Sequence, residues 1–331
     1  MTLPNFFIIG AQKAGTTSLY HYLTQHPQIY MSPVKEPCFF NYEINSDGGI
    51  VAEEFGNPGR KKVARFSNVE EYRALFRGVQ QETAIGEASP PYLYVPGTAE
   101  RIKRCVPEAK MIVILRNPAN RAYSAFLHAV RIGREPLTDF AKALGEEERR
   151  IDENWHYTFH YRSRGFYHAQ LEHYYRLFGR EKIRVRLYED LSYDPIGVAQ
   201  SIYHFLGVDD TFVPDASAKH NPAGVPRNKI ARTMIRGIDL TASAFLETFT
   251  STSRIYPLAA KLRRRIQNQI VVKPPPIDPE IRRELMEGYT KDILKLQDLI
   301  ERDLSAWLQD EDTDSMQGVS AAGVSGYGKS Y

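Results

Sequence analysis

The sequence predicts an α/β protein of three layers, in which helices flank a central parallel sheet. Two runs of apolar residues without polar alternation, 6–9 and 111–115, are typical of strands buried on both faces of a parallel sheet. A segment with helical spacing follows the first run, and strands that alternate with helices indicate the α/β class. The chain has 331 residues, of which 42% are hydrophobic and 25% charged, and is long enough to bury such a core.

The first strand is expected over residues 6–9, Phe-Phe-Ile-Ile. A loop with two glycines follows it directly. Leu19, Tyr22 and Leu23 then recur at helical spacing until Pro27 ends the pattern. The sequence therefore predicts a strand, a loop and a helix in immediate succession.

Two further strands complete the predicted sheet. Residues 111–115 end in Arg116-Asn117-Pro118, where Asn117 can cap a helix and Pro118 suits its first turn. Residues 183–187 alternate apolar with basic side chains, which favours a strand nearer the edge of the sheet.

The organisation of the chain is interpreted as one α/β domain over residues 1–309. Residues 42–80 are rich in glycine, asparagine and charge, which favours a surface excursion with short helices. Residues 210–275 are expected to supply a loop and helices that border the substrate. Apolar positions recur every three or four residues over 281–307 and predict one long helix. The composition of residues 310–331 predicts a disordered tail.

Charge and cysteine content argue against several classes of protein. The formal net charge of +3 is too small to predict a nucleic-acid partner. Cys38 and Cys105 provide neither a disulfide framework nor a zinc-binding spacing. The N-terminus has no basic segment and only a short apolar run, so we expect a cytoplasmic protein without integral membrane association. The sequence does not define an oligomeric state.

The loop after the first expected strand has the pattern Gly10-x-x-x-x-Gly15-Thr16-Thr17. Between a buried strand and a helix, such a loop directs backbone N–H groups toward a phosphate, as in P-loop folds. Nucleotide triphosphatases place a lysine directly after the second glycine, whereas here Thr16 takes that position and Lys13 lies within the loop. This favours a phosphate ligand over a metal-bridged triphosphate; the simpler alternative is a turn that needs its glycines only for conformation. The candidate nucleotide-binding residues of the loop are Gln12, Lys13, Ala14, Gly15, Thr16 and Thr17.

A second candidate phosphate site follows the strand at 111–115. Arg116 stands at the strand end and Ser124 about two helical turns later. Arginine offers a bidentate fork to phosphate and serine a hydroxyl donor, and α/β proteins bind ligands at the carboxyl edge of the sheet. Taken singly, each residue favours the simpler interpretation, a surface ion pair for Arg116 and a solvated side chain for Ser124.

Together these segments resemble the sulfotransferases that depend on 3′-phosphoadenosine 5′-phosphosulfate (PAPS), and most closely the branch with the heparan sulfate sulfotransferase domains. FFIIGAQKAGTTSL is similar to the 5′-phosphosulfate loop of that family, and ILRNPANRAYSAFLH to its 3′-phosphate segment. The resemblance covers about residues 5–210. It also includes KEPCFF at 35–40, GEASPPY at 86–92, RGFY at 164–167 and YEDL at 188–191.

The resemblance implies PAPS as co-substrate, the desulfated nucleotide PAP as product, and no requirement for a metal. It assigns to Lys13 the stabilisation of charge on the leaving phosphate and to Glu36 the role of catalytic base. Without the resemblance, a partner for Lys35 is the simpler interpretation of Glu36. His128, one turn beyond Ser124 on the same helix face, is a second candidate for the base or an acceptor ligand.

The resemblance also suggests residues that contact the acceptor and the nucleotide. Lys35, Glu87 and Ser89 are candidate acceptor-binding residues, although the turn at Ser89 could equally be a proline loop with a capping serine. Arg227 is a candidate nucleotide contact. The basic run 263–265 is interpreted as a solvated helix face, with a patch for an anionic acceptor or a membrane surface as the alternative.

The sequence therefore predicts a sulfotransferase that moves the sulfuryl group from PAPS to a hydroxyl, or less readily an amine, of a small-molecule or glycan acceptor. Two alternatives stay open. A P-loop phosphotransferase, a kinase of a small metabolite, would depend on Mg²⁺. A non-catalytic PAP- or PAPS-binding module would use the acceptor cleft to hold a partner.

Overall fold

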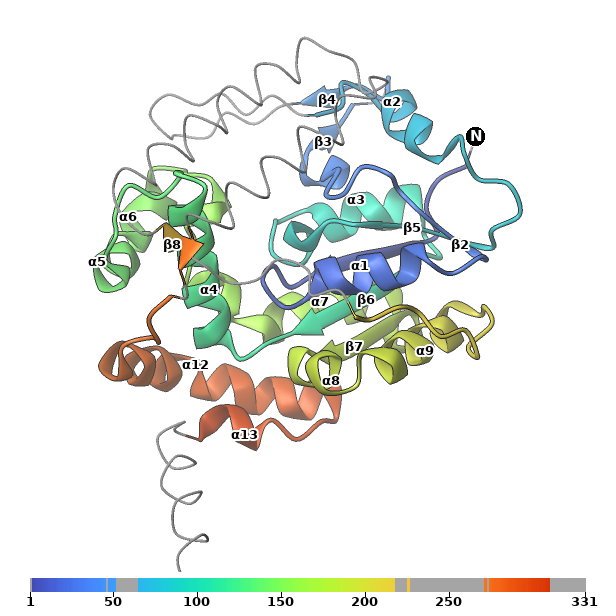
Figure 1. Cartoon of the computed structure of the whole chain (residues 1–331). Coiled ribbons are helices and arrows are strands. Elements are labelled where there is room, and N and C mark those ends of the chain that lie inside the picture. Colours follow the sequence, from blue (N-terminus) through green and yellow to red (C-terminus); the bar gives the residue numbers. More distant parts are fainter. Residues whose placement is uncertain are drawn as a thin grey trace, which may run out of the picture.

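The structure, a computed structural model, describes residues 2–45, 47–51, 65–217, 225–226, 271–272 and 274–309. Five parallel strands form the central sheet in the order β2-β5-β1-β6-β7 (Figure 1). Their bounds are β1 Phe6–Gly10, β2 Ile29–Met31, β5 Ala84–Ala88, β6 Lys110–Leu115 and β7 Ile183–Leu187. Two small antiparallel pairs are β3 Glu43–Ile44 with β4 Ile50–Val51, and β8 Val225–Pro226 with β9 Val271–Val272.

The helices that connect and cover the strands are α1 Thr16–Thr24, α2 Val69–Arg73, α3 Thr98–Cys105, α4 Pro118–Arg131, α5 Phe140–Gly145, α6 Glu147–Asp152, α7 Tyr167–Phe178, α8 Tyr188–Tyr193, α9 Pro195–Leu206, α12 Pro279–Ile300 and α13 Ser305–Leu308. Asn117 caps α4 as predicted, because its side chain accepts hydrogen bonds from the N–H groups of Ala119 and Asn120.

Right-handed crossovers place helices on both faces of the sheet. The chain crosses the sheet in one direction from β1 to β2, and in the opposite direction from β5 to β6 and from β6 to β7. Because parallel crossovers are right-handed, α1 lies on one face and α3 and α7 lie on the other. α9 packs against α1, and α12 packs against α7 (Figure 1). The predicted three-layer α/β fold is confirmed.

β7 lies at an edge of the sheet, as its alternating sequence predicts. It pairs only with β6 within the central sheet. Ile183 and Leu187, at its two ends, are buried, whereas Arg184 and Arg186 are half-buried. The side chains of this edge strand are less completely covered than those of the central strands β1 and β6.

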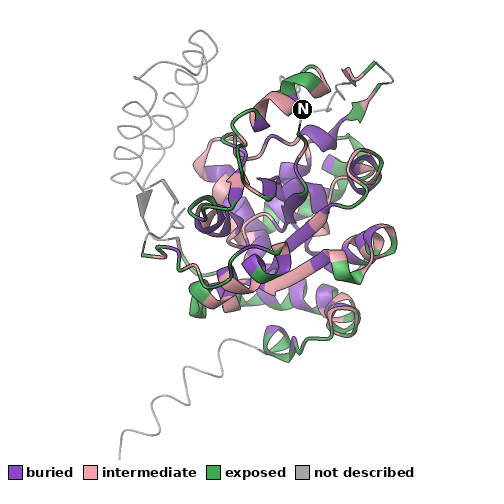
Figure 2. Ribbon diagram, turned by 90° about the vertical axis from the view of Figure 1, so that its right-hand side faces the viewer, coloured by how far each residue is buried: buried purple, intermediate pink, exposed green. Residues whose placement is uncertain are grey.

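The adjacent strands β1 and β6 form the centre of the core. All residues of β1 are buried, and so are residues 111–115 of β6; Figure 2 shows this central region in purple. Parallel pairing brings the carboxyl ends of β1 and β6 to the same edge of the sheet. The two loops with predicted phosphate-binding residues therefore begin side by side.

The predicted single helix over 281–307 is wrong. It is interrupted between α12 and α13, because Glu301 adopts a left-handed backbone conformation with φ 53°. Leu304 and Trp307 are buried beyond the break. The apolar spacing thus indicates which residues face the core. After a turn, the chain can still direct its apolar residues toward the core without a continuous helix.

The segment 42–80 carries short helices, as predicted, but it does not lie wholly at the surface. Tyr72 in α2 is completely buried, and its ring stacks on Phe39 with ring centroids 4.3 Å apart. The periodicity of the segment is too weak to reveal this, because a single inserted aromatic side chain leaves no repeating pattern.

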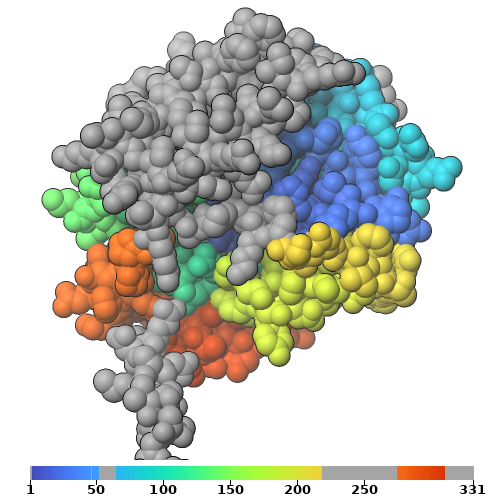
Figure 3. All heavy atoms as spheres, viewed as in Figure 1, coloured from blue at the N-terminus to red at the C-terminus, as the bar shows by residue number. Residues whose placement is uncertain are grey.

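Several predicted features lie outside the described residues: Arg227, the basic run 263–265, residues 310–331 and most of 210–275. Among the described residues, α9 contacts α1, and Figure 3 shows the yellow atoms of α9 beside the blue atoms of the N-terminal segment. Within the described ranges, no helix is both long and apolar enough to cross a bilayer.

Candidate active site

The loop between β1 and α1 presents backbone N–H groups at a helix N-terminus. Gly15 is the N-cap of α1, no side chain caps the helix, and no acidic residue lies in its first turn. The first N–H groups of a helix lack partners within it and attract an anion. Gly15 has φ 91°, and a Cβ atom there would lie 2.7 Å from Leu191 Cδ2, so this turn requires glycine. The local geometry fits a phosphate-binding loop.

The predicted loop residues differ in burial. Ala14 and Thr16 are buried, whereas Gln12, Lys13, Gly15 and Thr17 are half-buried. The threonine that replaces the lysine of nucleotide triphosphatases therefore packs into the fold, while Lys13 keeps partial access to the outside of the loop.

Lys13 lies among several charged side chains. Burial, and then Arg131, lowers the pKa of Lys13 to about 8, although Glu36 acts in the opposite direction. Arg116 and Lys35 also lower this pKa. Three cationic groups and one carboxylate thus act on the Lys13 ammonium group. A ligand with several negative charges would stabilise this group of cations, so the electrostatics favour a phosphate ester over a neutral ligand.

Glu36 forms an ion pair with its neighbour Lys35. Lys35 Nζ lies 2.7 Å from Glu36 Oε1, and the two side chains are 25% and 38% exposed. A partly exposed pair of this kind contributes at most about 1 kcal/mol to stability. An entering acceptor can therefore displace Lys35 from the carboxylate at little cost, which is compatible with a catalytic base.

His128 is held as a neutral imidazole. Burial, together with the nearby cations Lys13 and Arg131, lowers the pKa of His128 to about 2. Arg131 Nη2 lies 3.1 Å from His128 Nδ1, and because a guanidinium can only donate, Nδ1 must accept. The nitrogen that could take a proton is thus already occupied. Of the two candidates for the base, this geometry favours Glu36.

Arg116 joins the end of β6 to the loop after β1. Its Nη1 atom donates to the carbonyl oxygen of Lys13 at 3.1 Å, and its guanidinium lies 4.6 Å from the centroid of the Tyr188 ring. Tyr167 Oη donates to the Arg116 carbonyl oxygen at 3.0 Å. Ser124 is half-buried near the end of the second turn of α4. The two predicted phosphate segments are therefore physically connected through Arg116.

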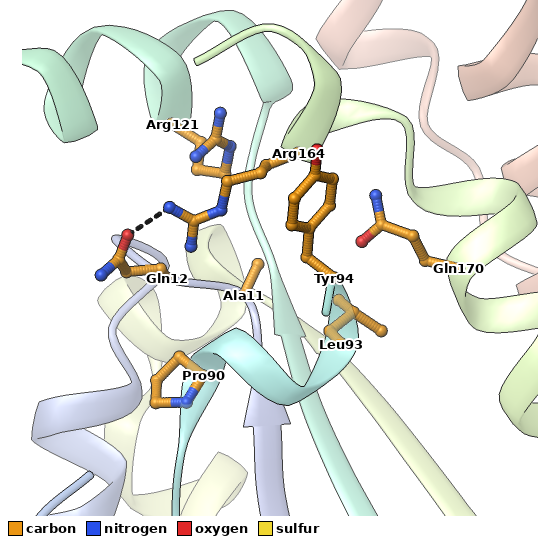
Figure 4. A pocket seen from close by; sticks show the side chains of 8 residues that line it. All are labelled: Ala11, Gln12, Pro90, Leu93, Tyr94, Arg121, Arg164 and Gln170. Carbon is orange, nitrogen blue, oxygen red and sulfur yellow. Dashed lines mark hydrogen bonds between the residues drawn. The ribbon is translucent and has the colours of Figure 1, made fainter. Parts of the chain in front are cut away.

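Gln12 faces two buried arginines beside the loop. Figure 4 shows a pocket lined in part by Gln12, Tyr94, Arg121 and Arg164. Arg164 Nη1 donates to Gln12 Oε1 at 2.6 Å. Burial, and then Arg121, lowers the pKa of Arg164 to about 10. Gln12 stays a candidate nucleotide contact, and its hydrogen bond with Arg164 joins the loop to a distant segment of the chain.

Glu87 and Ser89, expected on the acceptor side, are both completely buried. Ser89 Oγ donates to Glu87 Oε2 at 2.6 Å. Burial raises the pKa of Glu87 to about 7, and hydrogen bonds from Ser89, Tyr92 and Tyr72 oppose that rise. In the observed conformation neither side chain reaches the surface, so their contacts are internal rather than with an acceptor.

Sequence reasoning did not identify Arg131 or Arg121 as part of this site. For Arg131 a signal exists, because it lies three residues after His128 and residues so spaced share a helix face. Arg121 has a similar signal, because it lies three residues before Ser124, but its almost complete burial cannot be inferred from that spacing. Among the described residues, no group of three or more histidine, cysteine, aspartate or glutamate side chains could hold a metal ion.

Comparison with known proteins identifies the family. The profile of the sulfotransferase family matches residues 4–212, which is more than half of the chain, and the chain belongs to this family. A solved structure, a sulfotransferase from Alicyclobacillus acidocaldarius, is 35% identical in sequence and superposes with a TM-score of 0.69. That match covers 93% of this chain and 100% of the other. The resemblance predicted from the two phosphate segments is confirmed.

Curated relatives are more distant. The membrane-associated sulfotransferase kil1 of Dictyostelium discoideum is 24% identical over 303 residues, covering 67% of this chain and 60% of that protein. Carbohydrate sulfotransferase 15 of Mus musculus is 33% identical over 159 residues, covering 38% of this chain and 27% of that protein. The chain thus spans less than two thirds of the length of either relative.

Proposed function

We propose that the protein transfers the sulfuryl group of PAPS to a hydroxyl group of a glycan. The observation that carries this proposal is the position of Lys13, which lies in an anion-binding loop, among further cations and within electrostatic reach of the Glu36 carboxylate. Sulfuryl transfer needs these two groups, a cation for the leaving phosphate and a base for the acceptor. Membership of the sulfotransferase family supports the same reaction.

In the proposed mechanism each residue has one task. The N–H groups of the loop and Lys13 bind the 5′-phosphosulfate, and Arg116 and Ser124 bind the 3′-phosphate. Glu36 takes the proton of the acceptor hydroxyl while the oxygen of that hydroxyl bonds to sulfur. The bond between sulfur and the bridging oxygen breaks, and Lys13 stabilises the negative charge that remains on the phosphate of PAP. No step requires a metal ion.

The acceptor class is argued from charge and from the relatives. Lys35 and Arg131 add positive charge near Lys13 and Glu36, which would suit an acceptor that carries negative groups. The relatives include a carbohydrate sulfotransferase and, at 29% identity over 221 residues, the bifunctional heparan sulfate N-deacetylase/N-sulfotransferase 4 of Mus musculus. A panel of chondroitin, de-N-sulfated heparin, p-nitrophenol and 1-butanol would separate a sugar hydroxyl, an amine, a phenol and a simple alcohol.

Nucleotide binding is the first test of the proposal. Calorimetric titration with PAP in the absence of Mg²⁺ should show tight binding, and ATP should bind more weakly. A protein that binds ATP with Mg²⁺ and not PAP would be a phosphotransferase. PAP binding without transfer of ³⁵S from PAPS to any acceptor of the panel would favour a non-catalytic binding module.

The variant Arg116→Ala should raise the KM for PAPS more than the KM for the acceptor. Arg116 stands on the proposed 3′-phosphate side and also holds the Lys13 carbonyl, so its loss should weaken donor binding by about 10- to 100-fold, as for a charged hydrogen bond. Titration with PAP and with adenosine 5′-monophosphate, which lacks the 3′-phosphate, checks this. A variant that discriminates PAP from adenosine monophosphate as well as the wild type does would contradict the 3′-phosphate assignment.

A further inference from the structure

The Glu87 carboxylate lies near the C-terminal end of β5. Residues 36–40, the Glu36 segment, are hydrogen-bonded to this end of the strand. Tyr72 and Tyr92 donate hydrogen bonds to the Oε1 atom of Glu87 at 2.8 and 2.7 Å, and Ser89 Oγ donates to Oε2 at 2.6 Å. Each hydroxyl has one hydrogen, which it directs to this carboxylate. The lone pairs of the hydroxyl oxygens are therefore left to face other donors.

Two of these three hydroxyls hold the backbone of the Glu36 segment. Ser89 Oγ accepts the N–H of Cys38 at 3.0 Å, and Tyr92 Oη accepts the N–H of Phe40 at 3.2 Å. The segment is held in a third place by Glu36 itself, whose N–H donates to the carbonyl oxygen of Ala88 at 3.0 Å. Alternate N–H groups along 36–40 are thus bound by the end of β5 and the turn that follows it.

The segment needs these anchors because its backbone is strained. Glu36 and Cys38 have φ 56° and 53°, a left-handed conformation that side chains other than glycine rarely adopt. Strained residues of this kind persist only where the surrounding structure fixes them. A carboxylate that orients two hydroxyls at once supplies such a constraint from inside the fold.

We propose that Glu87 is a positioning residue for catalysis, because its buried carboxylate orients the Ser89 and Tyr92 hydroxyls that hold the strained segment on which Glu36 stands. This inference rests on the proposed role of Glu36 as the base. It also accounts for a buried carboxylate with three hydroxyl partners, which neither donor binding nor acceptor binding uses.

Two tyrosines provide a matched pair of variants. Tyr72 and Tyr92 are both completely buried and donate to the same oxygen of Glu87. Of these two tyrosines, Tyr92 is the one whose hydroxyl also accepts a backbone N–H from the Glu36 segment, that of Phe40. Tyr92→Phe therefore removes a link to Glu36, while Tyr72→Phe removes a similar hydrogen bond without such a link. Ser89→Ala and Glu87→Gln test the other links of the network.

The first readout is amide hydrogen exchange of residues 36–40, which needs no acceptor. Tyr92→Phe, Ser89→Ala and Glu87→Gln should each raise the exchange rate of this segment at least about tenfold, which corresponds to the loss of one hydrogen bond. Tyr72→Phe should leave that rate near the wild-type value. Equal exchange rates in Tyr72→Phe and Tyr92→Phe would overturn the proposal, whatever their effect on overall stability.

The second readout is transfer of ³⁵S from PAPS to the best acceptor of the panel. Tyr92→Phe and Ser89→Ala should lower kcat by about 10- to 100-fold, since small misplacements of a catalytic group have effects of this size. The dissociation constant of PAP should change little in these two variants. Tyr72→Phe should keep a kcat near the wild-type value. Unchanged kcat in Tyr92→Phe and Ser89→Ala would also overturn the proposal.

Combination with Glu36→Gln separates this inference from the proposed function. If Glu87 acts through Glu36, adding Tyr92→Phe to Glu36→Gln should still raise amide exchange but should lower kcat no further. Wild-type kcat in Glu36→Gln alone would instead refute the role of Glu36, and with it the basis of the inference. If the single variant Tyr92→Phe has full kcat and the single variant Glu36→Gln is inactive, only the positioning role is refuted.

Discussion

The variant Glu36→Gln should retain PAP binding and lose nearly all transfer. Removal of a general base typically lowers kcat by about 10²- to 10⁴-fold. Within the described part of the chain, Glu36 is the carboxylate that raises the pKa of Lys13, against several cations that lower it. The neutral amide should therefore leave the affinity for the anionic PAP unchanged or slightly higher. Calorimetry with PAP and ³⁵S transfer from PAPS measure the two quantities separately.

Lys35→Met is the control for this prediction. It breaks the 2.7 Å ion pair with Glu36 but leaves the carboxylate in place. Since a half-exposed pair contributes little, kcat should fall far less than in Glu36→Gln. Equal losses in the two variants would show that the ion pair, and not the base, is what catalysis requires. Wild-type kcat in Glu36→Gln would remove Glu36 from the mechanism.

The variant Lys13→Met should weaken PAP binding and lower kcat by about 10²- to 10³-fold, the usual effect of removing a preorganised group that stabilises transition-state charge. Its folding should not suffer. The pKa of Lys13 is lowered in the fold, so the charged form is disfavoured there. Thermal unfolding at pH 7 should therefore occur at the wild-type temperature or above it, which would exclude unfolding as the cause of the lost activity.

The same lysine should make PAP binding depend on pH. With a pKa of about 8 in the free protein, Lys13 is about half protonated at pH 8. Bound phosphate favours the ammonium form and raises this pKa, so binding at pH 8 should take up about half a proton. Affinity should fall as the pH rises from 8 toward 10. Calorimetry in buffers of different ionisation enthalpy measures this uptake, and its persistence in Lys13→Met would assign it to another group.

The sheet and the phosphate-binding loop could be predicted from the sequence because their signals are local. The apolar run before Gly10, the glycine spacing and the Asn117-Pro118 helix start each involve residues that are adjacent in the chain. A strand buried on both faces and a capped helix are determined largely by such short patterns. The family resemblance rested on the same two segments and was confirmed over residues 4–212.

The internal roles of several residues could not be predicted, because they depend on contacts between distant segments. Glu87 was expected beside the acceptor. Its carboxylate accepts a hydrogen bond from Tyr72, which lies in the segment 42–80. Likewise Gln12 meets Arg164, which is 152 residues away. A pattern along the chain contains no information about which polar side chain a remote tyrosine or arginine will reach.

The order of the strands has a consequence for how new specificities can arise. β1 lies between β5, which anchors the Glu36 segment, and β6, which Arg116 follows directly. In the proposed assignment, the parts that recognise the acceptor and those that recognise the nucleotide are thus attached to different neighbours of one central strand. Substitutions on the β5 side can select another acceptor while the β6 side continues to bind the same donor. Such a division allows acceptor preference to diverge in descendants of one ancestral enzyme without loss of the shared reaction.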